Sequence, residues 1–324
     1  MTKSTNKTVL VTGGVGFIGS HLCESLAAQG HKVIVFDNFD PYYDRSLKEQ
    51  NAALLHKHGV VIIEGDLRNS SAMTAAMSTY KPDTIIHLAA RAGVRPSLED
   101  PLTYVEVNLG GTIRLLELAR EFGVRDIVFA SSSSVYGFST APKFKETDNT
   151  DAPLSPYGAT KKAGELLCHT YHHLYGMSFA CLRFFTVYGP RQRPDLAIRK
   201  FVRLALDNQE LPVFGDGQSS RDYTHIKDIL TGIEGALDWV ANDAPRFGIF
   251  NLGSSHPVVL NDMIDMIEEF VGKPVKRRHL PMQPGDVPRT FADSSKAETE
   301  LGFTQSVSFR DGLYDFVGWM KSNY

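Results

Sequence analysis

Residues 9–19 of this 324-residue chain, VLVTGGVGFIG, are its most informative sequence for predicting the fold. An apolar run is followed at once by glycines in the spacing GxxGxxG, and then by a helical pattern to about Ala28. Glycines let the backbone approach a pyrophosphate at the amino end of a helix, where unpaired N–H groups and the helix dipole favour an anion. The stretch therefore predicts a dinucleotide-binding turn between a strand and a helix. The contacts expected here come from Gly13, Gly16, Phe17, Ile18 and Gly19.

A carboxylate stands at the end of the next strand. The apolar run His31 to Phe36 ends at Asp37, which is followed by Asn38. A carboxylate at this place can accept both ribose hydroxyls of an adenosine and would repel a 2'-phosphate. This predicts NAD rather than NADP. The alternative is that Asp37-Asn38 is only a turn.

Further apolar strands alternate with helical segments, one of which spans 103–122. The expected strands are residues 60–64, 83–90, 126–130, 177–182 and 248–252. Alternation of this kind predicts an α/β fold, a doubly wound parallel sheet of Rossmann type. Because ligands of such sheets lie beyond the carboxyl ends of the strands, Asp66, Leu67 and Ala89 join the expected cofactor contacts, with Asp66 facing the adenine.

The rest of the chain predicts a smaller α/β lobe for substrate binding. We expect the NAD-binding domain to comprise residues 1–188, with 223–255 returning to it, and the lobe to comprise 189–222 and 256–324. The lobe and the returning segment are expected to contain helices 195–208, 226–241 and 260–271, strands 212–214 and 275–279, loops 215–223 and 283–289, and two short terminal helices.

Composition excludes several classes of protein. A net charge of -3 and a pI near 6.4 lack the basic footprint of a nucleic-acid binder. The polar start and the glycines that interrupt the first apolar run give no targeting or membrane segment, which predicts a cytoplasmic protein. Its three cysteines are scattered and odd in number, as suits reduced thiols. No metal is expected, since His169, His172 and His173 are more typical of a solvated helix face.

The stretch Ser155 to Glu165 carries a phenol and an ammonium one helical turn apart, at Tyr157 and Lys161. A neighbouring positive charge favours the phenolate and lowers the phenol pKa from its usual value of about 10. Tyr157 is therefore a candidate general base. Taken alone, the spacing is weak evidence, because a Tyr and a Lys four residues apart on a helix are usually ordinary surface neighbours.

Together these residues resemble the extended short-chain dehydrogenase/reductases, which act on nucleotide-activated sugars. The resemblance covers nearly the whole chain and rests on GGVGFIG at 13–19, Asp37, Gly65-Asp66-Leu67, HLAA at 87–90, SSSSVYG at 131–137, Tyr157-x-x-x-Lys161 and RFFTVYGPRQRP at 183–194. It implies NAD as cofactor and Ser132, Tyr157 and Lys161 as catalytic residues. It also implies that the lysine holds the nicotinamide ribose.

The resemblance further implies a UDP-sugar substrate. Arg221 matches the family position at the diphosphate and Asp286 the position at the uridine ribose. The segment 91–99, which contains Arg95, and the pair Thr186 with Arg193 are most similar to UDP-glucuronate 4-epimerases. There Arg193 would hold the C6 carboxylate, with hydroxyls from Thr186, Ser133 and Ser134. Arg193 could instead bind a phosphate or cap the lobe.

The implied reaction is 4-epimerisation of a UDP-hexose through a 4-keto intermediate, with UDP-glucuronate favoured. UDP-glucose or UDP-N-acetylhexosamine 4-epimerisation is the alternative. Dehydratases and decarboxylases of the family need carboxyl groups where Ser133 and Ser134 stand, so these activities are disfavoured. A silent NAD-binding regulator is disfavoured by the intact catalytic residues. The resemblance also implies a homodimer paired through helices 103–122 and 157–175.

Overall fold

The computed structural model describes residues 6–282 and 286–323, so part of the expected loop 283–289 lies outside the described residues. The chain divides into two compact units. The first comprises Met1–Gly137, Asn149–Arg183 and Ile233–Phe250, and the second Phe138–Asp148, Phe184–Gly232 and Asn251–Tyr324. The domain boundaries inferred from sequence stay a prediction, and each unit is described here by itself.

The first unit is built on a seven-stranded sheet. In sheet order its strands are β10 (Phe247–Leu252), β6 (Ser178–Phe184), β5 (Asp126–Ser132), β4 (Thr84–His87), β1 (Thr8–Thr12), β2 (Lys32–Asp37) and β3 (Val61–Glu64). The ladders from β5 to β3 are all parallel. The doubly wound α/β fold is thus confirmed. In register, Thr12 pairs with Phe36 and with His87, so the carboxyl ends of β1, β2 and β4 meet at one edge.

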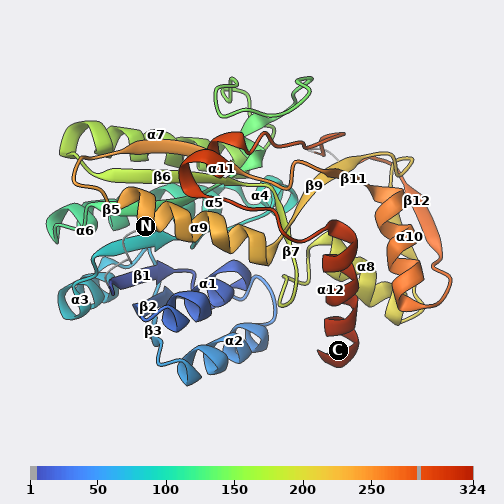
Figure 1. Cartoon of the computed structure of the whole chain (residues 1–324), viewed down its shortest axis with the longest axis horizontal. Coiled ribbons are helices and arrows are strands. Elements are labelled where there is room, and N and C mark those ends of the chain that lie inside the picture. Colours follow the sequence, from blue (N-terminus) through green and yellow to red (C-terminus); the bar gives the residue numbers. More distant parts are fainter. Residues whose placement is uncertain (1–5, 283–285, 324) are drawn as a thin grey trace. The chain divides into compact units, whose positions relative to one another are not determined.

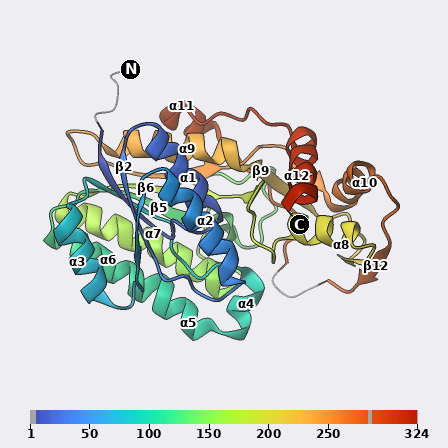
Figure 2. The same cartoon turned by 90° about the horizontal axis from the view of Figure 1, so that it is seen from below.

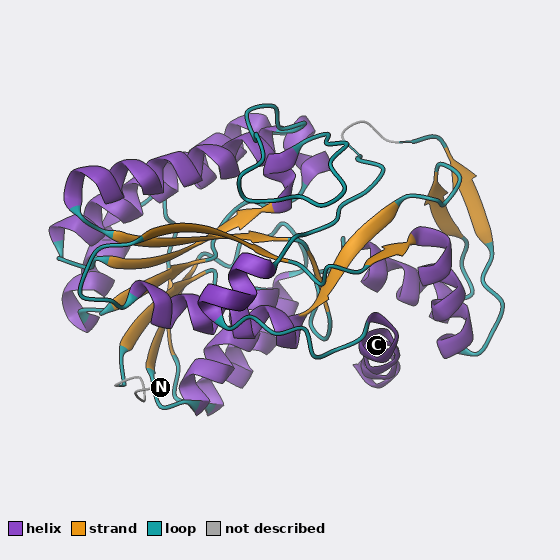
Figure 3. Cartoon of the chain, turned by 45° about the horizontal axis from the view of Figure 1, so that its top comes forward, coloured by secondary structure: helices purple, strands orange, loops and turns teal. Residues whose placement is uncertain are grey.

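Helices cover both faces of this sheet (Figures 1 and 3). On one face lie α1 (Phe17–Ala28) and α2 (Arg45–Lys57), and on the other α3 (Ser70–Tyr80), α6 (Thr112–Glu121) and α7 (Pro156–Tyr175), which Figure 2 shows side by side. Between the sheet and the helices α3, α6 and α7 on this second face lies a buried apolar cluster. It includes Leu10, Ile34, Met77, Leu115, Phe129, Cys168 and Phe179.

Strand β4 ends earlier than expected. It was predicted to reach Ala90 but stops at His87. The amide of Leu88 still donates to the carbonyl of Thr12 (3.1 Å), whereas that of Ala89 donates to the Thr12 side chain (3.3 Å). A side chain therefore replaces the strand ladder at this point and turns the chain away from the sheet.

The expected helix 103–122 is interrupted. The structure has α5 (Pro101–Val105), a π-helical turn η1 (Glu106–Gly111) and then α6. Asn108 in this turn donates to the Arg91 carbonyl (3.0 Å) and the Thr160 hydroxyl (3.0 Å), and accepts from the Arg91 amide (2.8 Å). Such turns are frequent at functional sites. Here the turn joins the segment after β4 to α7.

The second unit has a three-stranded sheet, β11 (Pro257–Val259), β9 (Ser220–His225) and β7 (Thr186–Tyr188), and a parallel pair, β8 (Leu211–Phe214) with β12 (Arg277–Leu280). The expectation of a loop through 215–223 was wrong at its end, because β9 begins at Ser220. Its buried Asp222 accepts the amides of Ser254, Ser255 and Ala292, which makes a carboxylate tolerable inside a strand.

Helices pack around these strands: α8 (Ala197–Leu206), α10 (Leu260–Val271) and α12 (Phe309–Asn323), with α11 (Ser295–Leu301). Helix α9 (Ile226–Val240) contributes residues to both units. The prediction of two short terminal helices holds for α11 only. Helix α12 has 15 residues because its apolar face, which includes Leu313 and Phe316, is buried in the core shared with α8 and α10.

Candidate active site

The glycine turn after β1 leaves no room for side chains. Gly13 has φ +74°, and a Cβ there would lie 2.8 Å from the amide nitrogen of Ala89. A Cβ at Gly19 would lie 2.3 Å from the carbonyl oxygen of Gly13. Helix α1 starts at Phe17, and its cap residue Gly16 supplies no side-chain acceptor. Backbone amides, including those of the predicted contacts Phe17 and Ile18, are therefore presented to a ligand as a diphosphate requires.

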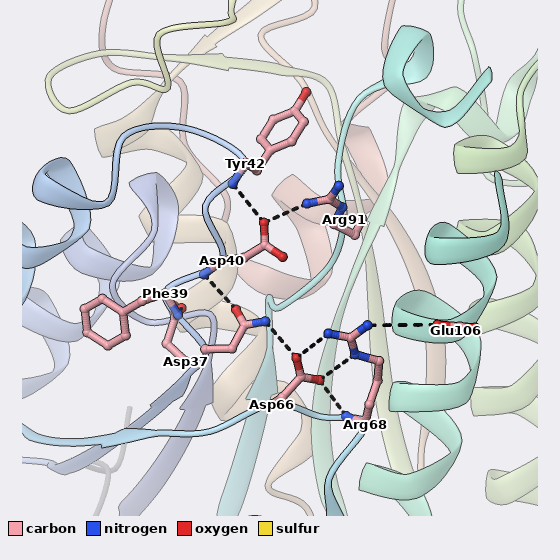
Figure 4. Close-up of polar contacts among 9 residues, drawn as sticks. Asp37, Phe39, Asp40, Tyr42, Asp66, Arg68, Arg91 and Glu106 are labelled. Atoms are coloured by element: carbon pink, nitrogen blue, oxygen red, sulfur yellow. Dashed lines mark hydrogen bonds and ion pairs between the residues drawn. The ribbon is translucent and has the colours of Figure 1, made fainter. Parts of the chain in front are cut away.

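Asp37 lies beside this turn, at the end of β2 (Figure 4). Its carboxylate accepts the amides of Val15 (3.2 Å) and Phe39 (2.9 Å). Burial raises the pKa of the Asp37 carboxyl, against the opposing effects of Lys48 and of these two amides. The glycine turn and a carboxylate fixed against it fit the phosphates and the adenosine ribose of a dinucleotide.

Asp66, expected at the adenine, is held by its neighbours. Arg68 forms two side-chain hydrogen bonds to it (3.0 and 2.8 Å; Figure 4). Asn38 donates to it from its side-chain amide (3.0 Å). The contact with Arg68 lowers the pKa of the Asp66 carboxyl. Asn38 and Asp66, both predicted cofactor contacts, are thus joined to each other, and their contact with an adenosine stays a prediction.

Sequence reasoning missed an ion pair across the site. Arg91, just after the HLAA segment, contacts Asp40 at 2.6 Å, and its guanidinium lies 5.2 Å from the ring centroid of Tyr42. Figure 4 shows the pair joining the loop after β2 to the segment after β4. Because β1 lies between these strands, the two loops that flank the glycine turn are tied together. The sequence did contain a signal for this pair, because Asp40 follows β2 and the oppositely charged Arg91 follows β4, the two strands that flank β1.

The predicted catalytic residues lie at the end of β5 and the start of α7. Ser132 is the last residue of β5, and its hydroxyl accepts the amide of Ser134 (3.2 Å) as a 3-10 turn, Ser133–Tyr136, begins. Tyr157 lies in the first turn of α7, which the Ser155 hydroxyl caps through the Gly158 amide (3.0 Å). The Tyr157 ring packs edge-on against Tyr104, with centroids 6.2 Å apart.

Lys161 is buried one turn further along α7, and its ammonium donates to the Ala130 carbonyl of β5 (2.7 Å). Burial lowers the pKa of Lys161 to about 8, although Cys168 and Glu165 act in the opposite direction. At neutral pH the side chain is thus still largely charged. A cation in this position favours the phenolate of a nearby tyrosine.

His87 lies between two hydroxyls beneath the same edge. Its ring nitrogens are 2.7 Å from Thr12 Oγ1 and 2.9 Å from Thr112 Oγ1. Burial and the charge of Lys161 lower the pKa of His87 to about 3. The imidazole is therefore neutral and fixes the packing of β1, β4 and α6.

The predicted substrate residues belong to both units. In the first, Arg95 lies in α4 (Val94–Glu99), while Ser133 and Ser134 begin the 3-10 turn. In the second, the strands of Thr186 and Arg221 are neighbours, since Thr186 pairs with Tyr223.

The remaining two are Asp286, which follows the gap in the described residues, and Arg193. The Arg193 fork is engaged by Asp195 at 3.0 and 2.6 Å. A substrate carboxylate bound by the same two nitrogens, Nε and Nη2, would have to exchange with that of Asp195.

Within 6–282 and 286–323, no three His, Cys, Asp or Glu side chains are grouped so as to hold a metal ion. No helix in this part of the chain is long and apolar enough to cross a membrane.

A glycine turn with a carboxylate beside it, a serine at the end of β5, and a tyrosine and a lysine one turn apart on α7 define an extended short-chain dehydrogenase/reductase. The chain belongs to the family described as GDP-mannose 4,6 dehydratase, whose model it matches over residues 10–316.

Similar proteins with more specific names cover nearly the whole chain. The UDP-glucuronate 4-epimerase of Thermodesulfobacterium geofontis (strain OPF15) is 42% identical over 315 residues, 97% of this chain and 96% of that protein. The crystal structure of UDP-glucuronic acid 4-epimerase from Bacillus cereus with UDP-glucuronic acid and NAD is 36% identical, with a TM-score of 0.91 over 98% and 100% of the two chains. UDP-glucose 4-epimerase of Thermotoga maritima with UDP-glucose is 30% identical, with a TM-score of 0.89 over 98% and 99%.

Proposed function

We propose that the protein is an NAD-dependent nucleotide-sugar 4-epimerase that converts UDP-glucuronate to UDP-galacturonate through a 4-keto sugar. The observation that carries the proposal is the end of β5, where the Lys161–Ala130 bond holds the strand of Ser132 against the helix of Tyr157. The names of the relatives, given above, support the substrate.

Bound NAD supplies a hydride acceptor that becomes the donor in the return step. Tyr157 takes the proton from the C4 hydroxyl as that carbon is oxidised, and gives it back when the ketone is reduced. Ser132 shares the hydrogen bond to the same oxygen. Lys161 supplies a positive charge that favours the phenolate form of a nearby tyrosine, and it would also hold the nicotinamide ribose of the bound cofactor. Return of the hydride to the other face of the ketone inverts C4.

Dehydration, the activity in the family's name, is not favoured by the residues after Ser132. Ser133 and Ser134 offer hydroxyls where an acid and a base would be needed. Glu165 does contact this part of β5, but Arg183 and Ser131 hold its carboxylate. A carboxylate in that arrangement is poorly placed for proton transfer to a substrate.

UDP-glucose 4-epimerisation is a second candidate, and one observation favours it. The fork of Arg193 is already paired with Asp195, which would suit a sugar that lacks a C6 carboxylate. The deciding experiment incubates the protein separately with UDP-glucuronate, UDP-glucose and UDP-N-acetylglucosamine and follows the products by NMR. We expect UDP-galacturonate as the main product. Turnover of UDP-glucose alone would select the second candidate, and no turnover would favour a silent NAD-binding regulator.

We expect Asp37→Ala to weaken NAD binding at least about tenfold and to reduce discrimination against NADP, because the acceptor of the ribose hydroxyls is lost. NAD content of the purified protein and titration calorimetry of the NAD-free protein with each dinucleotide measure this. Glu49→Ala, which removes an exposed carboxylate of α2, is the control. Unchanged affinities in Asp37→Ala would remove Asp37 from the cofactor site.

A homodimer is proposed through the helices 101–121 and 156–175. Both carry exposed apolar side chains, among them Leu102, Leu166 and Leu174, which are 75%, 56% and 60% exposed. Isolated apolar residues are common on surfaces, but several on adjoining helices indicate an interface. Light scattering at micromolar concentration should give twice the chain mass, and Leu102→Glu/Leu166→Glu should give a monomer. Tyr314→Glu on α12 should leave the mass unchanged. A monomeric wild type would contradict the proposal.

The cytoplasm is proposed as the location of the protein. Its three cysteines, Cys23, Cys168 and Cys181, are all buried and free, as suits a reducing compartment.

A further inference from the structure

The first unit buries an ion pair beside the end of β5, the strand that carries Ser132. The side chains of Glu165 on α7 and Arg183 on β6 are each 1% exposed. Two parallel hydrogen bonds of 2.8 Å join them, Nε to Oε1 and Nη2 to Oε2. Replacing such a pair by apolar residues is often neutral or stabilising, so stability alone does not account for two buried charges.

The pair is connected to both ends of the segment that carries Ser132. Before it, the Ser131 hydroxyl donates to Glu165 Oε1 at 2.6 Å. After it, the Tyr136 ring lies against the Arg183 guanidinium, 4.8 Å from centroid to Cζ. Ser131, Ser132 and Tyr136 are all buried. The backbone from Ser132 to Val135 is thus anchored to one ion pair at its two flanks.

Glu165 lies on the same face of α7 as the proposed catalytic residues Tyr157 and Lys161. Tyr157, Lys161 and Glu165 follow one another at intervals of four residues on α7. Lys161 bonds the Ala130 carbonyl and Glu165 the next side chain, Ser131. Two adjacent residues of β5 are therefore fixed to two successive turns of α7. These contacts fix the position of Ser132 along the axis of α7, and so its distance from Tyr157.

We propose that Glu165, held by Arg183, is a positioning residue that fixes the strand end of Ser132 against the helix of Tyr157 and Lys161. The inference rests on the proposed function, since it assigns these residues a shared task in proton transfer. Displacements of about 1 Å at such a site can lower turnover by about 10²-fold. A residue that fixes the spacing therefore contributes to kcat without contacting the substrate.

The charge of Glu165 adds a second effect. The groups facing Lys161 are Glu165 and Cys168 on α7, His87 on β4, and the Ala130 carbonyl and Phe129 ring on β5, with Arg183 of β6 behind Glu165. His87 is neutral, and Glu165 acts to raise the pKa of Lys161. Activity requires charged Lys161 and is lost as the pH rises through its pKa. Removing the Glu165 charge should therefore move the alkaline limb of the pH profile to lower pH.

Ser131→Ala tests the spacing, because it detaches the strand end and leaves the ion pair intact. We expect kcat to fall about tenfold or more, with KM and the alkaline limb unchanged. Ser131→Thr, which keeps the hydroxyl, should restore kcat. Hydrogen exchange at the amides of 132–136 should rise in Ser131→Ala whether or not the chain is an epimerase. A wild-type kcat and wild-type exchange in folded Ser131→Ala would overturn the proposal.

Glu165→Gln tests the charge, because it keeps an acceptor for Ser131. We expect a lower kcat and an alkaline limb displaced toward lower pH. An unshifted limb in folded Glu165→Gln would overturn the electrostatic part, and if this variant does not fold, Ser131→Ala still decides the positioning. Phe179→Leu, a core change on β6, should lower the melting temperature and leave kcat and the pH profile unchanged. A wild type that turns over no nucleotide sugar would refute the proposed function, while the exchange experiment would still test the anchoring.

Discussion

Replacing Tyr157 by phenylalanine is expected to lower kcat by about 10²–10⁴-fold while fold and NAD binding persist. The ring that packs edge-on against Tyr104 is retained, so only the hydroxyl is lost. Without it, no side chain in the proposed mechanism can take the proton of the C4 hydroxyl. Ser132 has only an alcohol to offer, and Lys161 is largely charged at neutral pH because its pKa is about 8. Initial rates by NMR with the favoured UDP-sugar measure the loss.

Tyr175→Phe is the matched control, since this tyrosine lies at the exposed end of the same helix. It should keep full activity and show that a lost phenol on α7 has no general effect. Melting temperature and NAD content should be the same in both variants and the wild type. Near-normal turnover by Tyr157→Phe would remove Tyr157 from the mechanism and would leave the general base unassigned.

Replacing Arg193 by alanine is expected to raise the KM for UDP-glucuronate much more than that for UDP-glucose. The two substrates differ only at C6, and a bidentate charged contact contributes about 1.5–3 kcal/mol, or roughly 10–100-fold. Oxidation of glucuronate at C4 makes a β-keto acid, which loses CO₂ when the bond to its carboxylate aligns with the ketone. Loss of the Arg193 clamp should therefore also increase the ratio of decarboxylated pentose product to UDP-galacturonate. Initial rates followed by NMR give the KM for each substrate, and the final spectra give the ratio of the two products.

Asp195→Asn tests whether the Arg193–Asp195 ion pair competes with the substrate carboxylate for Arg193. In the structure Asp195 occupies the fork that a substrate carboxylate would need. Removing its charge should lower the KM for UDP-glucuronate and leave that for UDP-glucose unchanged. Equal losses on both substrates in Arg193→Ala would place Arg193 at the diphosphate. The sequence argument for glucuronate would then fail.

The features that depend on neighbours along the chain could be predicted from the sequence. The glycine spacing from Gly13 to Gly19, the carboxylate at the end of β2, and the Tyr157/Lys161 interval are local patterns. Each predicted strand of the large sheet lies within two residues of the observed one, apart from β4. The alternation of strands and helices then predicted a parallel sheet, because parallel strands need crossover connections and a helix between two strands provides one.

The features that depend on distant partners could not be predicted from the sequence, because those partners meet only in the folded chain. Strand β9 forms because β7 and β11 flank it and because Asp222 satisfies three amides from segments 32 to 70 residues away. Arg91 meets Asp40 across 51 residues, and Ser131 meets Glu165 across 34. The sequence does not show which distant group will form a hydrogen bond or ion pair with a given polar residue. Only folding removes water from these side chains, and burial then makes each depend on its partner.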